Sequence, residues 1–146
     1  MGLDTTHGAW HGAYSAFMRW RQEIAKAAGI PNLELMEGYF RPEHWLLDVV
    51  SWHPAHRATD EGWLPLRWEQ VHVTPGLLIL LSHSDCEGEL TPDECTSVAD
   101  ELERLMPELA KAGDAGGHVG DVAQKTQTFI DGCRLAAANG ETLEFH

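Results

Sequence analysis

Apolar residues recur at steps of three and four in three segments of the chain, and this spacing predicts three amphipathic helices. The first covers residues 13–28. The second begins at Thr91, where Glu94 three positions later completes a capping box, and Pro107 is expected to kink or end it. The third runs over residues 121–138, with a polar and a buried face like the other two.

Other segments have the patterns of strands. Residues 67–73 alternate between apolar and polar, and residues 142–146 alternate in the same way. The aliphatic run 76–82 follows a Pro-Gly pair and is interpreted as a buried strand. These elements predict an α+β fold in which the three helices pack on one small sheet, within a single compact domain spanning residues 1–146.

The sequence pattern does not decide the secondary structure of the tryptophan-rich stretch between the first helix and these strands. Trp45, Val49 and Trp52 could form one stripe of a short helix, or the segment could be extended. Proline interrupts this stretch repeatedly, which is typical of an irregular wall over a core and also of a binding cleft.

The net charge of the chain limits the kinds of partner that we expect it to bind. The chain has 146 residues and a formal charge of -13, which argues against direct binding to a nucleic-acid backbone. It contains no apolar run near the ~20 residues that a membrane helix needs, and its N-terminus lacks the pattern of a secretion signal. We therefore expect a cytoplasmic protein with no membrane partner.

The excess of acid is concentrated between residues 85 and 108. This region carries nine carboxylates and a single base, Arg104. Such a face can bind a basic surface on another protein, as a phage- or host-related inhibitor would, or it can simply keep a helix soluble. The carboxylates are Asp85, Glu87, Glu89, Asp93, Glu94, Asp100, Glu101, Glu103 and Glu108.

Three cysteines give an odd number, which is not typical of a secreted disulfide framework. Cys86 and Cys95 are close enough in sequence to meet as a disulfide. Because cytosolic disulfides are uncommon, two buried thiols are the simpler expectation. Cys133 falls on the apolar side of the third helix and is expected in the core.

The segment from His83 to Glu94 resembles the twelve-residue calcium loop of EF-hand proteins. His83 takes loop position one, Asp85 position three, Glu87 position five and Gly88 position six, and Glu94 takes the last. Two departures count against calcium: an imidazole replaces the expected aspartate, and the preceding segment has the pattern of a strand where a helix is needed. A softer divalent ion, zinc first, suits an imidazole better.

The chain has nine histidines to complete such a site. His7 and His11 have the spacing that places two imidazoles on one helical face, so His83, Asp85, His7 and His11 are the predicted metal ligands. A metal-activated water would make hydrolysis the default reaction, with Glu87 or Glu89 as general base. The alternative is that His83 and Asp85 only form hydrogen bonds that order the loop.

A second histidine pair lies in the tryptophan-rich stretch. His53 and His56 are close in sequence, and Asp60 follows them. Neither this pair nor the first has the specificity of a known zinc motif.

Several segments together resemble a family of small uncharacterised proteins encoded by actinobacteria and their phages. The resemblance rests on His7-Gly8 and residues 11–14 leading into residues 17–21, on residues 80–89, and on the closing stretch from Phe129 to His146. These segments cover about a third of the chain. The family has no assigned activity, so the resemblance implies a setting and no mechanism.

Overall fold

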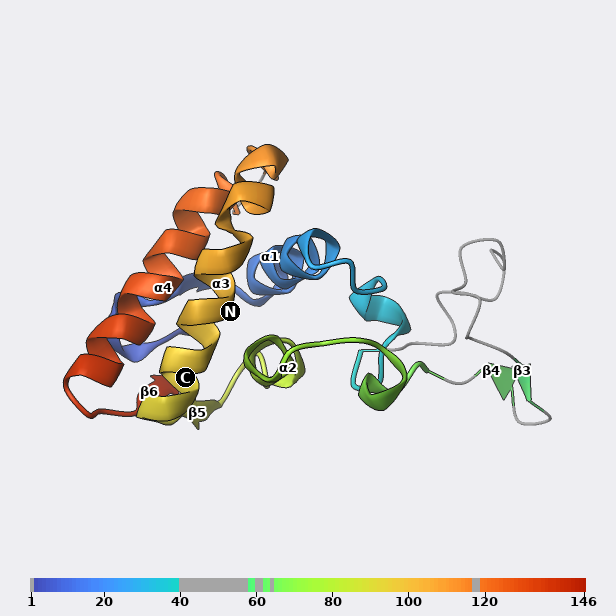
Figure 1. The fold of residues 1–146 in the computed structure, drawn as a ribbon, viewed down its shortest axis with the longest axis horizontal. Coiled ribbons are helices and arrows are strands. Elements are labelled where there is room, and N and C mark those ends of the chain that lie inside the picture. The colour runs from blue at the N-terminus through green and yellow to red at the C-terminus, as the bar shows by residue number, and fades with distance from the viewer. Residues whose placement is uncertain (1, 40–57, 60–61, 64, 117–118) are drawn as a thin grey trace.

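A computed structural model describes residues 2–39, 58–59, 62–63, 65–116 and 119–146 of the chain (Figure 1). The expectations for the Trp45–Trp52 stripe, and for His53, His56 and Asp60, lie outside the described residues. Within those residues the chain combines helices and short antiparallel strands, so the predicted α+β class is confirmed.

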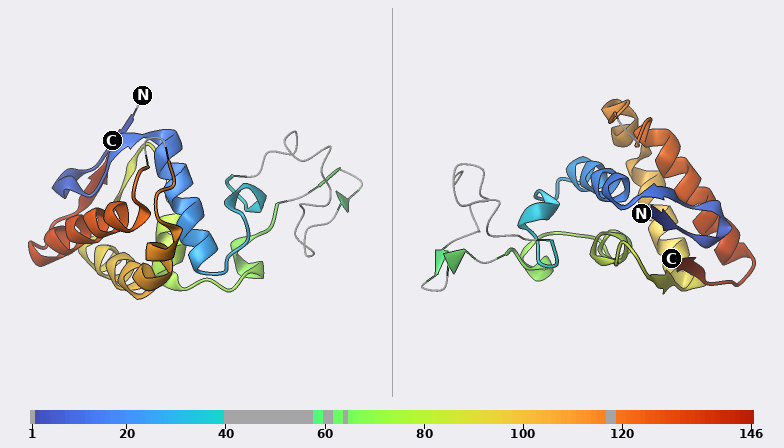
Figure 2. Two further views of the ribbon diagram at one scale, coloured as in Figure 1. Left: turned by 90° about the horizontal axis from the view of Figure 1, so that it is seen from above. Right: turned by 180° about the vertical axis from the view of Figure 1, so that it is seen from behind.

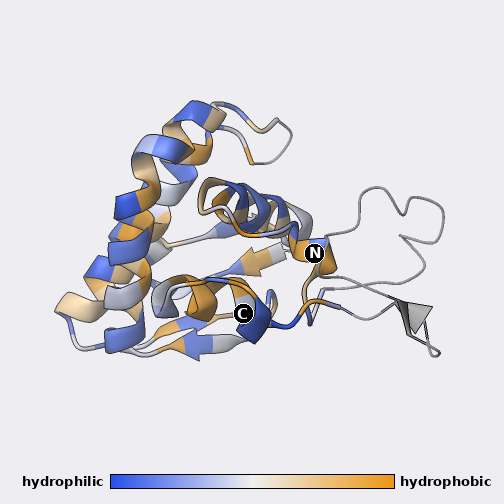
Figure 3. Cartoon of the chain, turned by 45° about the vertical axis from the view of Figure 1, so that its right-hand side comes forward, coloured by the Kyte–Doolittle hydropathy of each residue, from blue (hydrophilic) through white to orange (hydrophobic). Residues whose placement is uncertain are grey.

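Three helices confirm the periodicity of the sequence. They are α1 (Tyr14–Ala27), α3 (Pro92–Ala112) and α4 (Val122–Ala138). Helices α3 and α4 lie side by side and antiparallel, and α1 crosses next to them (Figure 1). Hydrophilic and hydrophobic residues alternate around α3 and α4, as the amphipathic pattern requires (Figure 3).

A fourth helix, α2 (Pro75–Ser82), replaces the strand expected at 76–82. The prediction failed because a short apolar run buried on several sides has no period that separates a strand from a helix. Pro75 at the first turn fits a helix start. Gly76 allows α2 to approach α3, since a Cβ atom there would lie 2.4 Å from the carbonyl oxygen of Ser97.

The strand expected at 67–73 is also wrong. Its centre forms a single 3-10 turn, Trp68–Gln70, like the turns at Thr6–Gly8 and Leu33–Leu35. Gln70 bonds back to the backbone of Arg67 at 2.9 Å, which closes the turn locally. The alternation of apolar and polar residues does not reveal this local hydrogen bond.

Pro107 does not end α3, which continues to Ala112. Proline removes one backbone hydrogen bond, but Leu109 beyond it is fully buried. The free energy gained by burying this leucine offsets the lost hydrogen bond, so the helix continues beyond the proline.

In the described part of the chain, the strands form three two-stranded antiparallel pairs instead of one sheet. Strand β1 (Gly2–Asp4) pairs with β2 (His11–Ala13), β3 (Ala58–Thr59) with β4 (Gly62–Trp63), and β5 (Gly88–Leu90) with β6 (Leu143–Phe145). The predicted closing strand at 142–146 is thus confirmed as β6.

The two ends of the described chain meet beside this strand. The backbones of Asp4 and His146 exchange two hydrogen bonds of 2.8 Å, and Thr5 bridges to Phe145. Both ends lie close together in two views of the molecule (Figure 2). These contacts connect the β1–β2 pair to β6 and, through it, to β5.

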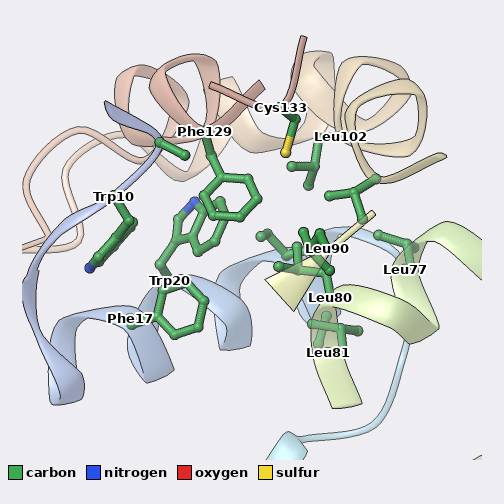
Figure 4. Packing of buried hydrophobic residues seen from close by; sticks show 14 of the residues in the cluster. Trp10, Phe17, Trp20, Leu77, Leu80, Leu81, Leu90, Leu102, Phe129 and Cys133 are labelled. Carbon is green, nitrogen blue, oxygen red and sulfur yellow. The ribbon is translucent and has the colours of Figure 1, made fainter. Parts of the chain in front are cut away.

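The core has an aromatic and an aliphatic half (Figure 4). Trp10, Phe17, Trp20 and Phe129 pack ring against ring, with the Trp20 and Phe129 centroids 4.9 Å apart. The buried indole nitrogen of Trp20 donates to Thr126 Oγ1 at 3.0 Å, so this ring has a polar partner inside the core. Leucines of α2 and α3 form the aliphatic half.

The three cysteines are free thiols, so the Cys86–Cys95 disulfide is absent. Cys86 is exposed, whereas Cys95 and Cys133 are buried, which confirms the core position expected for Cys133. None of the helices described here is both long and apolar enough to cross a lipid bilayer.

Candidate functional site

The segment that resembles a calcium loop connects α2 to α3. Ser84 orders its first turn, because its Oγ accepts from the backbone N–H groups of Cys86 at 3.2 Å and Glu87 at 3.4 Å. Gly88 has a φ of 108°, a conformation that glycine adopts at little cost. The loop then enters β5 and ends at the first turn of α3. A helix, not a strand, therefore precedes the loop.

His83 is held at the centre of this loop. Its Nδ1 lies 2.8 Å from the carbonyl oxygen of Ser84, and its Nε2 lies 3.2 Å from that of Glu89. The ring also packs on Phe145 of β6, with centroids 4.2 Å apart. Since a carbonyl oxygen only accepts, each of these bonds forms only when the ring nitrogen that faces it carries a proton.

The predicted partners of His83 lie elsewhere. His11 bonds to Asp4 across the β1–β2 pair. His7 contacts Thr6 Oγ1 at 2.8 Å and Glu141 at 3.3 Å, and the hydrogen bond from His7 lowers the pKa of that carboxyl group. Neither histidine is on an α-helix, so their spacing does not place the two imidazoles on one helical face.

The carboxylates of the loop are also dispersed. Glu94 accepts from the backbone N–H of Thr91 at 2.9 Å and so completes the predicted capping box. Glu87 and Glu89, the predicted general bases, are exposed. Across the described ranges, no group of three or more histidine, cysteine or acidic side chains is arranged to hold a metal ion. The four predicted ligands are therefore not brought together.

Asp85 instead borders a cavity of about 400 Å³. The segment after α1 lines the same cavity through Glu34 and Glu37. Tyr39 and Trp68 add aromatic surface. Among the residues that the structure describes, none of the three carboxylates forms an ion pair.

Arg21 forms the inner wall of this cavity and is almost wholly buried, with 1% of its surface exposed. Its Nη1 donates to the carbonyl oxygens of His83 at 2.6 Å and Leu80 at 3.3 Å, at the end of α2. The guanidinium also lies over the rings of Phe17 and Tyr39, 4.5 and 5.2 Å from their centroids. These contacts place the positive charge at the negative end of a helix dipole and against two π faces.

Burial is the main cause of the shifted pKa values in this wall. It lowers the pKa of the Arg21 guanidinium, against the opposing effects of Tyr39 and Asp85. Burial likewise raises the pKa of Tyr39, against the opposing effect of Arg21. Arg21 remains protonated at neutral pH because guanidinium groups start from so high a pKa. Its Nε has no hydrogen-bond partner in the described part of the chain.

The acidic face of α3 is partly neutralised within the chain. Arg134 of α4 pairs with Asp100 at 2.7 Å and Glu103 at 3.0 Å. Arg104 pairs with Glu101, and Lys111 pairs with Glu108 at 2.9 Å. A basic partner of this face, which stays a prediction, would have to compete with these internal ion pairs.

The sequence reasoning missed Arg21, Tyr39, Glu34 and Glu37 as site residues. One signal was present for Arg21. This residue follows Trp20 on a helix whose apolar residues lie on both sides of Arg21. A lone arginine next to such a stripe is usually exposed, so the signal was weak. Nothing local marked the other three, because their shared cavity depends on packing between distant segments.

Comparison with known proteins adds no assignment. No protein-family model, no curated protein and no solved structure matches the chain. The geometry of the cavity is therefore the basis on which a function can be assigned.

Proposed function

We propose that this protein binds a small organic cation, such as an amine, in the cavity beside Arg21. The observation that carries the proposal is that Glu34, Glu37 and Asp85 border one cavity without forming ion pairs in the described part of the chain. Among the described residues that line the cavity, three carboxylates outnumber one guanidinium and one imidazole, those of Arg21 and His83. The site therefore favours a positively charged guest.

The aromatic side chains point to an organic cation. An ammonium group over an aromatic face gains electrostatic attraction, and Tyr39 and Trp68 are among the residues that line the cavity. Trp68 is 9% exposed, so its ring is firmly held. A cavity of about 400 Å³ is in the usual range for a small molecule.

A bare metal ion fits the same residues less well. Metal ligands approach an ion to about 2.0–2.6 Å and must converge on one point. The carboxylates here surround a much larger volume, and the described residues contain no converging group of ligands. An anion is disfavoured as well, because Arg21 is buried and already donates to carbonyl oxygens.

Titration calorimetry at low salt with the diamine putrescine tests the proposal. We expect saturable binding that weakens as salt rises, because it depends on charge. The double variant Glu34→Gln and Glu37→Gln should weaken binding by about 10- to 100-fold, or about 1.4–2.7 kcal/mol. Both changes conserve side-chain size and remove only charge.

The matched control is Glu87→Gln with Glu89→Gln, which removes the same charge from exposed positions outside the cavity lining. This variant should bind nearly as the native chain does. Uncharged butanediol should not bind. Equal losses in the two double variants would show a non-specific charge effect and contradict the proposal, as would the absence of putrescine binding.

A further inference from the structure

The loop between α2 and α3 keeps the backbone plan of a calcium loop, in the described residues 83–94. Helices flank it on both sides. Gly88 takes the sharp turn at position six with a φ of 108°, and Leu90 at position eight is fully buried. Thr91 at position nine caps the second helix. Helix, loop and helix therefore follow one another in the order of an EF-hand, although position one is a histidine.

The position of the imidazole is the unexpected feature. In a calcium loop, the backbone carbonyl of position seven coordinates the ion. That residue is Glu89 here, and its carbonyl oxygen lies 3.2 Å from Nε2 of His83. The ring thus contacts a group that an ion would otherwise bind. We propose that the His83 imidazole occupies the place of the calcium ion and makes the fold of this loop independent of metal.

The remaining ligand positions agree with this substitution. The position-twelve carboxylate, Glu94, bonds to the N–H of Thr91, and the position-five carboxylate, Glu87, is exposed. Asp85 at position three borders the cavity beside Arg21. Without a divalent charge at the centre, mutual repulsion favours this separation of the carboxylates.

The surroundings fit the ring closely. Phe145 packs on one side of the imidazole, with a centroid distance of 4.2 Å. Gly88 is also close, since a Cβ atom at that position would lie 3.0 Å from Cε1 of the ring. The glycine of position six is thus needed twice, for its backbone conformation and for the space that the ring fills.

The variant His83→Asp tests the proposal, because it restores the aspartate of position one. Calcium chloride titrated into native protein should give no saturable heat up to about 1 mM, the weak end of EF-hand affinities. The variant should bind calcium at least about tenfold more tightly than the native chain. Adding Glu94→Gln to it should abolish the gain, since position twelve normally supplies two ligand oxygens.

The native chain provides a second measurement in case His83→Asp folds poorly without metal. Circular dichroism with and without calcium would show whether the ion restores the fold of the variant, which would support the proposal. In native protein, an NMR nuclear Overhauser effect between the Cε1–H of His83 and the α protons of Gly88 should be observed, because the ring lies against this glycine.

Three results would overturn the proposal. The first is calcium binding by the native chain as tight as that of the variant. The second is a folded His83→Asp variant that binds no calcium. If the variant stays unfolded with and without calcium, absence of the nuclear Overhauser effect between His83 and Gly88 in folded native protein is the third.

Discussion

Arg21 shows how one residue joins the core to the candidate site. Its guanidinium donates to the carbonyl oxygens of Leu80 and His83, and its carbon chain lies within the core next to Phe17. A buried charge is costly unless its hydrogen bonds are satisfied, and here the end of α2 provides the acceptors. Arg21 therefore fixes α2 to α1 and shapes one wall of the cavity at the same time.

We expect Arg21→Met to lower the free energy of unfolding by about 1–3 kcal/mol, because it leaves the partly buried carbonyl oxygen of His83 without its donor. Urea denaturation monitored by tryptophan fluorescence measures the loss. Lys26→Met on the same helix is the control, since Lys26 is exposed and should change stability by less than about 0.5 kcal/mol. A loss no larger than that of the control would show that the contacts of Arg21 contribute little to stability.

At the scale of elements, close approach between segments decides positions that helical propensity would fill differently. Gly132 lies in the middle of α4, where alanine would normally stabilise a helix by about 1 kcal/mol. A Cβ atom there would lie 2.5 Å from the Cβ of Ala9 and 2.6 Å from its Cα. The 3-10 turn before Ala9 thus packs directly on the backbone of α4, and only glycine leaves the space.

Gly132→Ala should therefore destabilise the protein, by about 1–3 kcal/mol, because overpacking against a backbone outweighs the gain in propensity. Thermal unfolding followed by circular dichroism gives the sign directly. Asp131→Ala is the neighbouring control, because its side chain is exposed and alanine should be neutral or slightly stabilising there. A rise in melting temperature for Gly132→Ala would contradict the packing described here.

At the scale of the whole molecule, β6 connects the two ends of the described chain with the candidate site. Phe145 contacts the rings of Phe17, Phe129 and His83, with centroid distances of 6.1, 6.5 and 4.2 Å. Its strand pairs with β5 on one side and bridges to Thr5 on the other. The aromatic core and the loop of His83 therefore share one side chain.

Phe145→Ala should lower the free energy of unfolding by about 3–5 kcal/mol, the usual cost of removing a buried phenylalanine. Amide hydrogen exchange should show that protection falls in β5 and in the 83–89 loop as well as in β6. Glu144→Ala, an exposed change in the same strand, should leave both measurements nearly unchanged. Loss of protection confined to β6 would show that the loop is held independently of this ring.

Local signals determined much of the fold. The stripes of α1, α3 and α4 repeat over many residues, and the Thr91–Glu94 capping box is formed by side chains three positions apart. Such patterns act within one segment, so the sequence contains all the information they need. The likeness of residues 83–94 to a calcium loop was visible for the same reason.

The sequence by itself thus determined the three amphipathic helices, their starts and the closing strand. It also determined the likeness of residues 83–94 to a calcium loop. Only the tertiary structure decided that 75–82 is a helix, that Arg21 is buried, and that Glu34, Glu37 and Asp85 share a cavity. It also placed the His83 ring against the carbonyl of Glu89. These outcomes depend on contacts between segments distant along the chain, and the free energy of such contacts is set by packing that no single segment specifies.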